Sequence, residues 1–136
     1  MNIKDYRILH SQIIEEYQYI EYHLEGLIAL MQANGEDFKA IAKSVGSDAM
    51  GELISKARKL VQENNYYDFL SKDDFKTLDT IKDDRNFYCH ENFLANINDN
   101  YKIERSTSIE QDLTLVKTFN DKLTQAFKDI SNIKDK

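Results

Sequence analysis

Apolar residues recur at helical spacing along most of the chain, and the longest such pattern comes first. Between Ile3 and Ala33, one row of apolar residues repeats every seventh position, and a second row lies four residues after three of its members. The first row is Tyr6, Ile13, Ile20 and Leu27, and the second is Tyr17, Leu24 and Met31. Rows with this offset share one face of an α-helix. The pattern predicts a long amphipathic helix over residues 3–33.

Three helices are expected in the middle of the chain, over residues 36–45, 49–63 and 72–96. The first of these is short and follows the helix-breaking pair Asn34-Gly35. The third begins after Ser71, which stands three residues before Asp74. A hydroxyl at this position and a carboxylate one turn later are typical of a helix amino terminus.

The last helix is expected after a loop through Lys102 and Arg105. Ser108 and Gln111 have the spacing of a capping box, so the helix should begin there. It continues through an apolar face formed by Ile109, Leu113, Val116, Leu123, Phe127 and Ile130. The predicted fold class is therefore all-α: a single domain over residues 1–136, built as an antiparallel bundle of about four principal helices plus a short one.

Composition agrees with this fold and narrows the range of functions. The chain has no proline and only four glycines, which favours long helices. Its single cysteine excludes an internal disulfide and any thiolate zinc site of the usual kind. The formal net charge of −6 argues against tight, nonspecific binding of duplex DNA. With no leader-like segment or membrane-length apolar run, we expect a soluble protein with no membrane partner, and the lone cysteine favours the reducing cytoplasm.

Several polar groups have both a structural and a functional interpretation. His10 and His23 lack a ligand partner at helical spacing, so a position at the edge of the core or on the surface is the simpler interpretation. The basic cluster Lys56, Arg58 and Lys59 indicates either a solvated helix face or a phosphate contact. A row of tyrosines in the first helix could stack bases, although packing explains it better. The row is Tyr6, Tyr17, Tyr19 and Tyr22.

Residues 83–94 depart from the pattern of an ordinary packed helix. In a helix over 72–96, one broad apolar stripe contains Phe75, Leu78, Ile81, Tyr88, Cys89 and Phe93. Arg85 falls inside this stripe, and Asn86 and His90 lie on its flank. Burying an unpaired arginine costs several kcal/mol, so Arg85 needs a partner. An arginine, an amide and an imidazole gathered on a packing face are typical of a functional site.

These residues resemble the signature of the HEPN domains (higher eukaryotes and prokaryotes nucleotide-binding). That signature is an arginine followed directly by a polar residue, then a histidine, with four to six residues in total between the arginine and the histidine. Here it reads Arg85-Asn86-Phe87-Tyr88-Cys89-His90. The resemblance implies a helical bundle that dimerises through the motif helices, with Arg85 and His90 as catalytic residues and Asn86 in support.

Many members of that family are endoribonucleases that need no metal, often toxins of toxin–antitoxin pairs or parts of phage defence. The resemblance thus implies RNA as substrate, single-stranded or a tRNA, with no cofactor or metal, and a cognate antitoxin protein as a further partner. Some toxins neutralised by a nucleotidyltransferase carry a modified tyrosine two residues after the histidine, where this chain has Asn92.

The chemistry of RNA cleavage suits these side chains. Attack by the 2′-hydroxyl requires a group that removes its proton, a group that protonates the leaving oxygen, and a positive charge on the phosphate. Histidine can transfer both protons, and arginine binds phosphate oxygens with its fork of donors. Asn86 would orient either the arginine or the substrate, and Asp84, Tyr88 and Glu91 are weaker candidates for substrate binding.

A homodimer is expected from helix geometry. Positions five apart differ by about 140° around a helix and by about 7.5 Å along it, so Arg85 and His90 of one chain do not form a compact site. Two motif helices facing each other would supply both residue types to one cleft. Arg85 would then pair with a substrate phosphate or with Asp84 or Glu91 across the interface.

A different class of function stays open on the same residues. In this alternative, the chain is a noncatalytic helical module that binds a protein partner or a nucleotide. Arg85 would then form a salt bridge to a neighbouring helix, and His90 would be hydrogen-bonded at the edge of the bundle. Tyr88 and Phe87 would pack rather than line a cleft, and Cys89 would be an apolar packing residue rather than a nucleophile.

Overall fold

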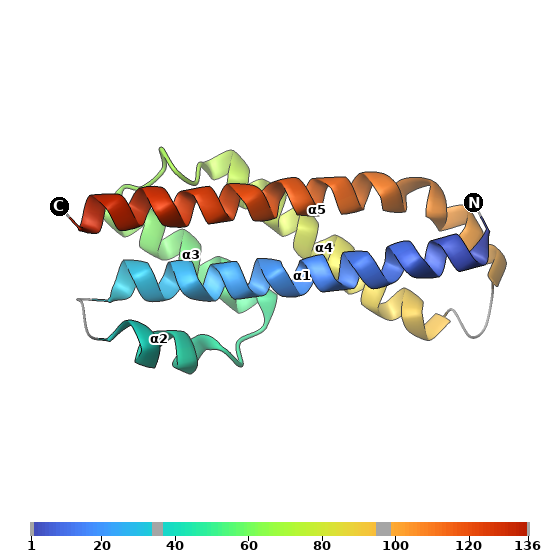
Figure 1. Cartoon of the computed structure of the whole chain (residues 1–136), viewed down its shortest axis with the longest axis horizontal. Coiled ribbons are helices and arrows are strands. Elements are labelled where there is room, and N and C mark those ends of the chain that lie inside the picture. Colours follow the sequence, from blue (N-terminus) through green and yellow to red (C-terminus); the bar gives the residue numbers. More distant parts are fainter. Residues whose placement is uncertain (1, 34–36, 95–98, 136) are drawn as a thin grey trace.

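The computed structural model describes residues 2–33, 37–94 and 99–135; for residue 3 and residues 90–94 and 99–107 it describes the backbone alone. The described chain is helical apart from short connections (Figure 1). The helices are α1 (Ile3–Gln32), α2 (Phe38–Val45), α3 (Met50–Asn64), α4 (Lys72–Leu94) and α5 (Asp99–Lys134). The predicted helical bundle of four principal helices and a short one is confirmed.

Helix α1 is the centre of the bundle and contacts each of the other four helices. Both apolar rows predicted from the sequence are buried along its full length: Tyr6, Ile13, Tyr17, Ile20, Leu24, Leu27 and Met31. Fully burying a side chain of this size contributes roughly 1.5–3 kcal/mol. The rows therefore supply a large part of the core that organises the fold.

Helices α1 and α5 lie side by side and run in the same direction, so the predicted antiparallel arrangement is wrong for this pair (Figure 1). Asn120 of α5 donates its amide to the carbonyl of Glu16 at 3.0 Å. Further along, the Lys134 ammonium donates to the carbonyl of Ala33 at 2.7 Å. Successive helices reverse direction along the chain, so α4 runs opposite to α1 and α5 (Figure 1).

The start of α5 differs from the prediction. Helix α5 begins at Asp99, so Lys102 and Arg105 lie within it and the predicted loop through them is wrong. Ser108 also lies inside the helix and does not cap it. A serine followed three residues later by glutamine is compatible with a helix interior when the apolar spacing continues on both sides. The predicted end of α4 at residue 96 lies outside the described residues.

The capping box of α4 is formed as predicted. The Ser71 amide donates to Oδ2 of Asp74 at 2.8 Å, and the Asp74 amide donates to Oγ of Ser71 at 3.1 Å. The same carboxylate binds Lys122 of α5, with Nζ and Oδ1 2.6 Å apart. Asp74 thus fixes both the start of the motif helix and its position against α5.

Replacing Ser71 with alanine is expected to lower the free energy of unfolding by about 1 kcal/mol, because the Asp74 amide loses its acceptor. Chemical denaturation followed by circular dichroism measures this. Ser108→Ala is the matched control and should change stability by no more than about 0.5 kcal/mol, since Ser108 is not at a helix end. Equal losses in both variants would contradict the capping assignment.

Candidate functional site

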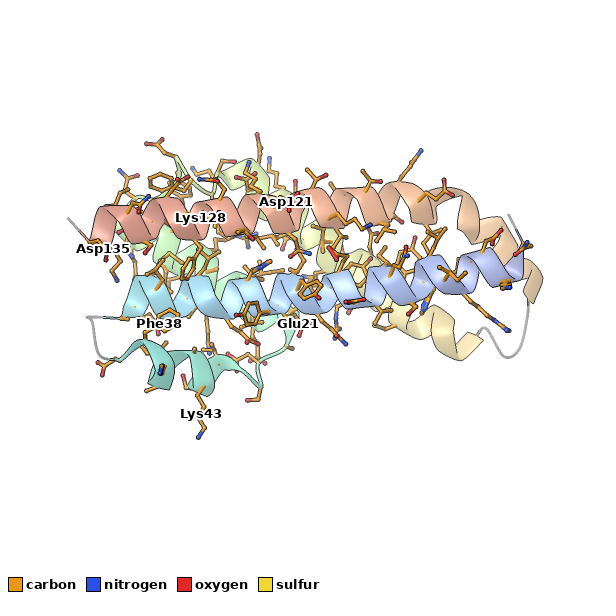
Figure 2. The ribbon with its side chains drawn as sticks, viewed as in Figure 1. Glu21, Phe38, Lys43, Asp121, Lys128 and Asp135 are labelled. Atoms are coloured by element: carbon orange, nitrogen blue, oxygen red, sulfur yellow. The ribbon has the colours of Figure 1, made fainter. Side chains whose placement is uncertain are left out.

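Arg85 extends from α4 to α1, where it has a carboxylate partner. Its Nε donates to Oε1 of Glu21 at 3.2 Å, and the Arg85 side chain remains 36% exposed. Glu21 lies near the middle of α1 (Figure 2). The sequence predicted a partner for Arg85, and the structure provides one within the same chain. The side chain is thus held by one carboxylate and stays partly exposed to solvent.

Of the other motif residues, Asn86 and Cys89 lie on the outer side of α4. Asp83, Asn86 and Cys89 are exposed and follow one another at three-residue intervals, so they share one face of the helix. The helical backbone continues through residue 90, one turn after Asn86. The side chains of His90 and Glu91 lie outside the described part of the structure, so their predicted roles stay predictions.

The apolar stripe of α4 is narrower than predicted. Phe75, Leu78, Ile81 and Tyr88 are buried. Cys89 is exposed, so its predicted place in the stripe is wrong. One residue beyond Tyr88 turns the helix by about 100°, which carries position 89 from the bundle side to the solvent side. The Phe93 side chain lies outside the described part.

Tyr88 anchors the motif helix to both long helices. It is fully buried, and its hydroxyl donates to Oδ2 of Asp112 in α5 at 2.5 Å. Its backbone carbonyl accepts a hydrogen bond from Nε2 of His10 in α1 at 2.9 Å. Because a carbonyl is only an acceptor, His10 carries its proton on Nε2. The packing interpretation of Tyr88 is confirmed, and its ring is inaccessible to a substrate in this conformation.

Tyr17 lies beside Tyr88, with ring centroids 6.4 Å apart. Its buried hydroxyl has no hydrogen-bond partner in the part of the chain that the structure describes. Burial raises the pKa of Tyr17, and the nearby negative charge of half-buried Asp84 raises it further. Two buried tyrosines therefore lie side by side beneath α4. The Tyr88 hydroxyl has a hydrogen-bond partner, and the Tyr17 hydroxyl has none among the described residues.

Sequence reasoning missed two residues of this region, Glu21 and Asp112, and placed a third, His10, at the edge of the core or on the surface. Glu21 stands four residues after Tyr17, at the edge of the buried face of α1, and Asp112 stands beside core residue Leu113. His10 continues the second apolar row backwards and is buried, as its core-edge interpretation predicts. A polar residue next to a regular apolar row was the available signal for all three.

His23 is a hydrogen-bonded residue at the edge of the core, as the simpler interpretation predicts. Its Nδ1 is 2.9 Å from Oδ1 of Asn120. The orientation of that amide is fixed, because its nitrogen donates to the carbonyl of Glu16. Oδ1 is therefore the acceptor, and His23 carries a proton on Nδ1.

The predicted basic cluster is paired with carboxylates throughout. Lys56 binds Asp48 at 2.5 Å, Arg58 binds Asp79 at 2.8 Å, and Lys59 lies 3.9 Å from Glu63. These pairs reduce the positive potential on this face of α3. The interpretation as an ordinary solvated helix face is the one that fits, and we assign the cluster no phosphate contact.

The chain matches no protein-family model, no curated protein and no solved structure. The resemblance to HEPN domains therefore rests on the α4 residues and on the order of the helices. Among the described residues, no helix combines the length and apolar character that crossing a membrane requires. Within the same part of the chain, no three His, Cys, Asp or Glu side chains gather closely enough to hold a metal ion.

Proposed function

We propose that this protein is a metal-independent endoribonuclease of the toxin–antitoxin or phage-defence type. The observation that carries the proposal is the state of Arg85: its guanidinium is fixed by Glu21, yet its side chain is 36% exposed beside exposed Asn86. A fixed, solvent-open arginine on a helix that also carries a histidine fits the binding of a phosphate next to a proton-transfer group.

The proposed reaction is attack of a ribose 2′-hydroxyl on the adjacent phosphorus. His90 removes the proton from the hydroxyl or, in the second copy, protonates the leaving 5′-oxygen, and Arg85 stabilises the charge on the phosphate. The P–O bond to the 5′-oxygen breaks as the new bond forms. The products are a 2′,3′-cyclic phosphate and a 5′-hydroxyl, with Asn86 orienting Arg85 or the substrate.

The proposed site is shared by two chains. Asp83, Asn86 and Cys89 form an exposed face of α4, which no other helix of the described chain buries. A second copy against this face would bring two arginines and two histidines to one cleft. The proposed partners are thus a second copy of the chain, an RNA with unpaired nucleotides or a tRNA, and a cognate antitoxin protein.

Cleavage of a labelled single-stranded RNA and a tRNA pool in excess EDTA tests the activity. We expect products that end in 2′,3′-cyclic phosphate. Light scattering under the same conditions tests the shared site, and a stable monomer that still cleaves RNA would exclude the dimeric arrangement. No cleavage of any RNA by the folded protein would exclude the endoribonuclease.

Glu21→Gln is expected to increase RNA affinity about two- to fivefold, because Arg85 loses a competing carboxylate while the bundle keeps its packing. Titration of a labelled, non-cleavable RNA measures the change. Glu15→Gln is the matched control. Glu15 is an exposed α1 carboxylate that accepts a hydrogen bond from Tyr19, and its substitution changes the net charge by the same amount. An equal increase in both variants would assign the effect to net charge rather than to Arg85.

The Arg85–Glu21 pair also favours a second candidate function. An arginine that already has an intramolecular carboxylate partner is what a noncatalytic helical module would contain. Such a module would use α4 to bind a protein partner or a nucleotide. Absence of cleavage, together with a loss of stability in Arg85→Ala, would favour this second function.

A further inference from the structure

A pocket of about 390 Å³ lies between α1, α2 and α5, and none of its lining residues belongs to the motif helix. Phe38 of α2 and Lys128 of α5 lie on opposite sides of α1 in the view that shows them (Figure 2). Pockets of this volume lie in the range that small molecules occupy. The proposed endoribonuclease assigns no role to this pocket.

The walls of the pocket are aromatic. Phe38 and Phe127 meet edge to face, with ring centroids 6.4 Å apart. Tyr22 lines the same pocket and is 68% exposed, so its ring stands at the rim. Three rings from three helices thus surround one space. The electron-rich faces of such rings attract both apolar groups and cations.

Gly26 forms part of the lining, in the last third of α1. A glycine inside a helix destabilises it relative to alanine. A Cβ at this position would lie 3.7 Å from Cε2 of Phe127, which is an ordinary van der Waals contact. Packing against Phe127 therefore does not require glycine. The missing side chain of Gly26 instead leaves the space beside the aromatic rings open.

One carboxylate and one ammonium group line the pocket. Burial raises the pKa of Glu25, and the negative charges of Glu21 and Asp48 raise it further. The surroundings of Glu25 therefore favour a cation. Lys128 is exposed on the last turns of α5, so its flexible stem can line the pocket while its ammonium group stays in water.

We infer that this pocket binds a small molecule that joins an aromatic ring to an ammonium group. The ring would pack among Phe38, Phe127 and Tyr22, in the space beside Gly26. The ammonium group would donate to the carboxylate of Glu25. This assignment is independent of RNA cleavage and would stand if the protein cleaved no RNA.

Titration of the full chain with phenethylamine, followed by NMR chemical shifts, tests the assignment. We expect saturable shifts at pocket residues, and binding of 3-phenylpropionate at least about tenfold weaker, because its charge is reversed. Glu25→Gln should weaken binding of the amine about three- to fivefold, whereas Glu15→Gln, at an exposed α1 carboxylate outside the pocket, should leave it unchanged. Equal binding of the amine and the acid would overturn the inference, as would an unaffected Glu25→Gln variant.

Gly26→Ala tests the space itself without risking the fold. The added methyl group should raise the Tm by about 2–5 °C, because alanine has a higher helix propensity than glycine. It should weaken phenethylamine binding by at least about fivefold, because it occupies space in the pocket. Tyr22→Ala should also weaken binding. Tyr19→Ala, at an exposed α1 tyrosine outside the pocket, should not. A Gly26→Ala variant that binds the amine as tightly as the parent would show that the ligand lies elsewhere.

Discussion

Replacing Arg85 or His90 with alanine is expected to lower the rate of RNA cleavage by roughly 10²–10⁴-fold while the chain stays folded. Arg85→Ala removes the charge that stabilises the phosphate, and His90→Ala removes the proton-transfer group. Single-turnover cleavage of a labelled RNA in EDTA measures the rate. Circular dichroism and light scattering establish that both variants keep the fold and the oligomeric state of the parent.

Arg58→Ala is a closely matched control for Arg85→Ala. Both arginines form an ion pair with a carboxylate of another helix, and their side chains are similarly exposed, at 43% for Arg58 and 36% for Arg85. Arg58 also donates to the carbonyl of Phe75 at 3.4 Å and lies over its ring, so Arg58→Ala should cost at least as much stability as Arg85→Ala. His23→Ala is the corresponding control for His90. A rate that falls equally in Arg58→Ala and Arg85→Ala would remove the basis for a catalytic Arg85.

Two neighbouring buried tyrosines should respond in opposite directions to loss of the hydroxyl. Tyr88→Phe is expected to destabilise the protein by about 1–3 kcal/mol, because Asp112 loses a donor in a half-buried site. Tyr17→Phe is expected to be neutral or to stabilise by up to about 1 kcal/mol, since its hydroxyl is buried without a protein partner among the described residues. The two side chains are chemically identical. A difference between the two variants in the free energy of unfolding, measured by urea denaturation, would therefore reflect the hydrogen bonding of the two hydroxyls.

Alkaline pH provides a second measurement on Tyr17. Its pKa is raised above the ordinary value of 10.0, so the folded chain keeps the phenol protonated where an unfolded chain ionises. This contribution to stability is complete below that pH and is lost as the pH rises above it. The parent should therefore lose stability above pH 10 more steeply than Tyr17→Phe, by up to about 1.4 kcal/mol per pH unit. A Tyr17→Phe variant that is clearly destabilised would instead show that the hydroxyl has a bound partner.

The helices were predictable because their signals are local. The apolar rows of α1 and the pair Ser71 and Asp74 each specify their structure within a few turns of chain, and both were confirmed. The start of α5 was not predictable in this way. Ser108 and Gln111 have the spacing of a cap, but nothing local distinguishes a cap from a helix interior when helical residues precede it.

The candidate site was predicted in part. The sequence indicated that Arg85 lies near the packed face and needs a partner, but the identity of Glu21 depends on how α4 crosses α1. The exposure of Cys89 depends on the width of the contact between helices, which helical periodicity leaves undetermined. The anchoring of Tyr88 by His10 and Asp112 joins residues from three helices, and such contacts are set by tertiary packing.

The pairing of α1 with α5 affects how the chain folds during its synthesis. The hydrogen bond from Asn120 to Glu16 spans 104 residues, and the ribosome makes α1 first. Helices α2, α3 and α4 can cover part of α1 earlier, but the part of the apolar face that α5 covers stays exposed until α5 has emerged, because α5 makes the most extensive contact with α1. Closing so long a loop slows folding, and the uncovered rows are a target for chaperones or for self-association during synthesis. Helix α1 is thus synthesised first, yet its buried face is completed only when the last helix packs against it.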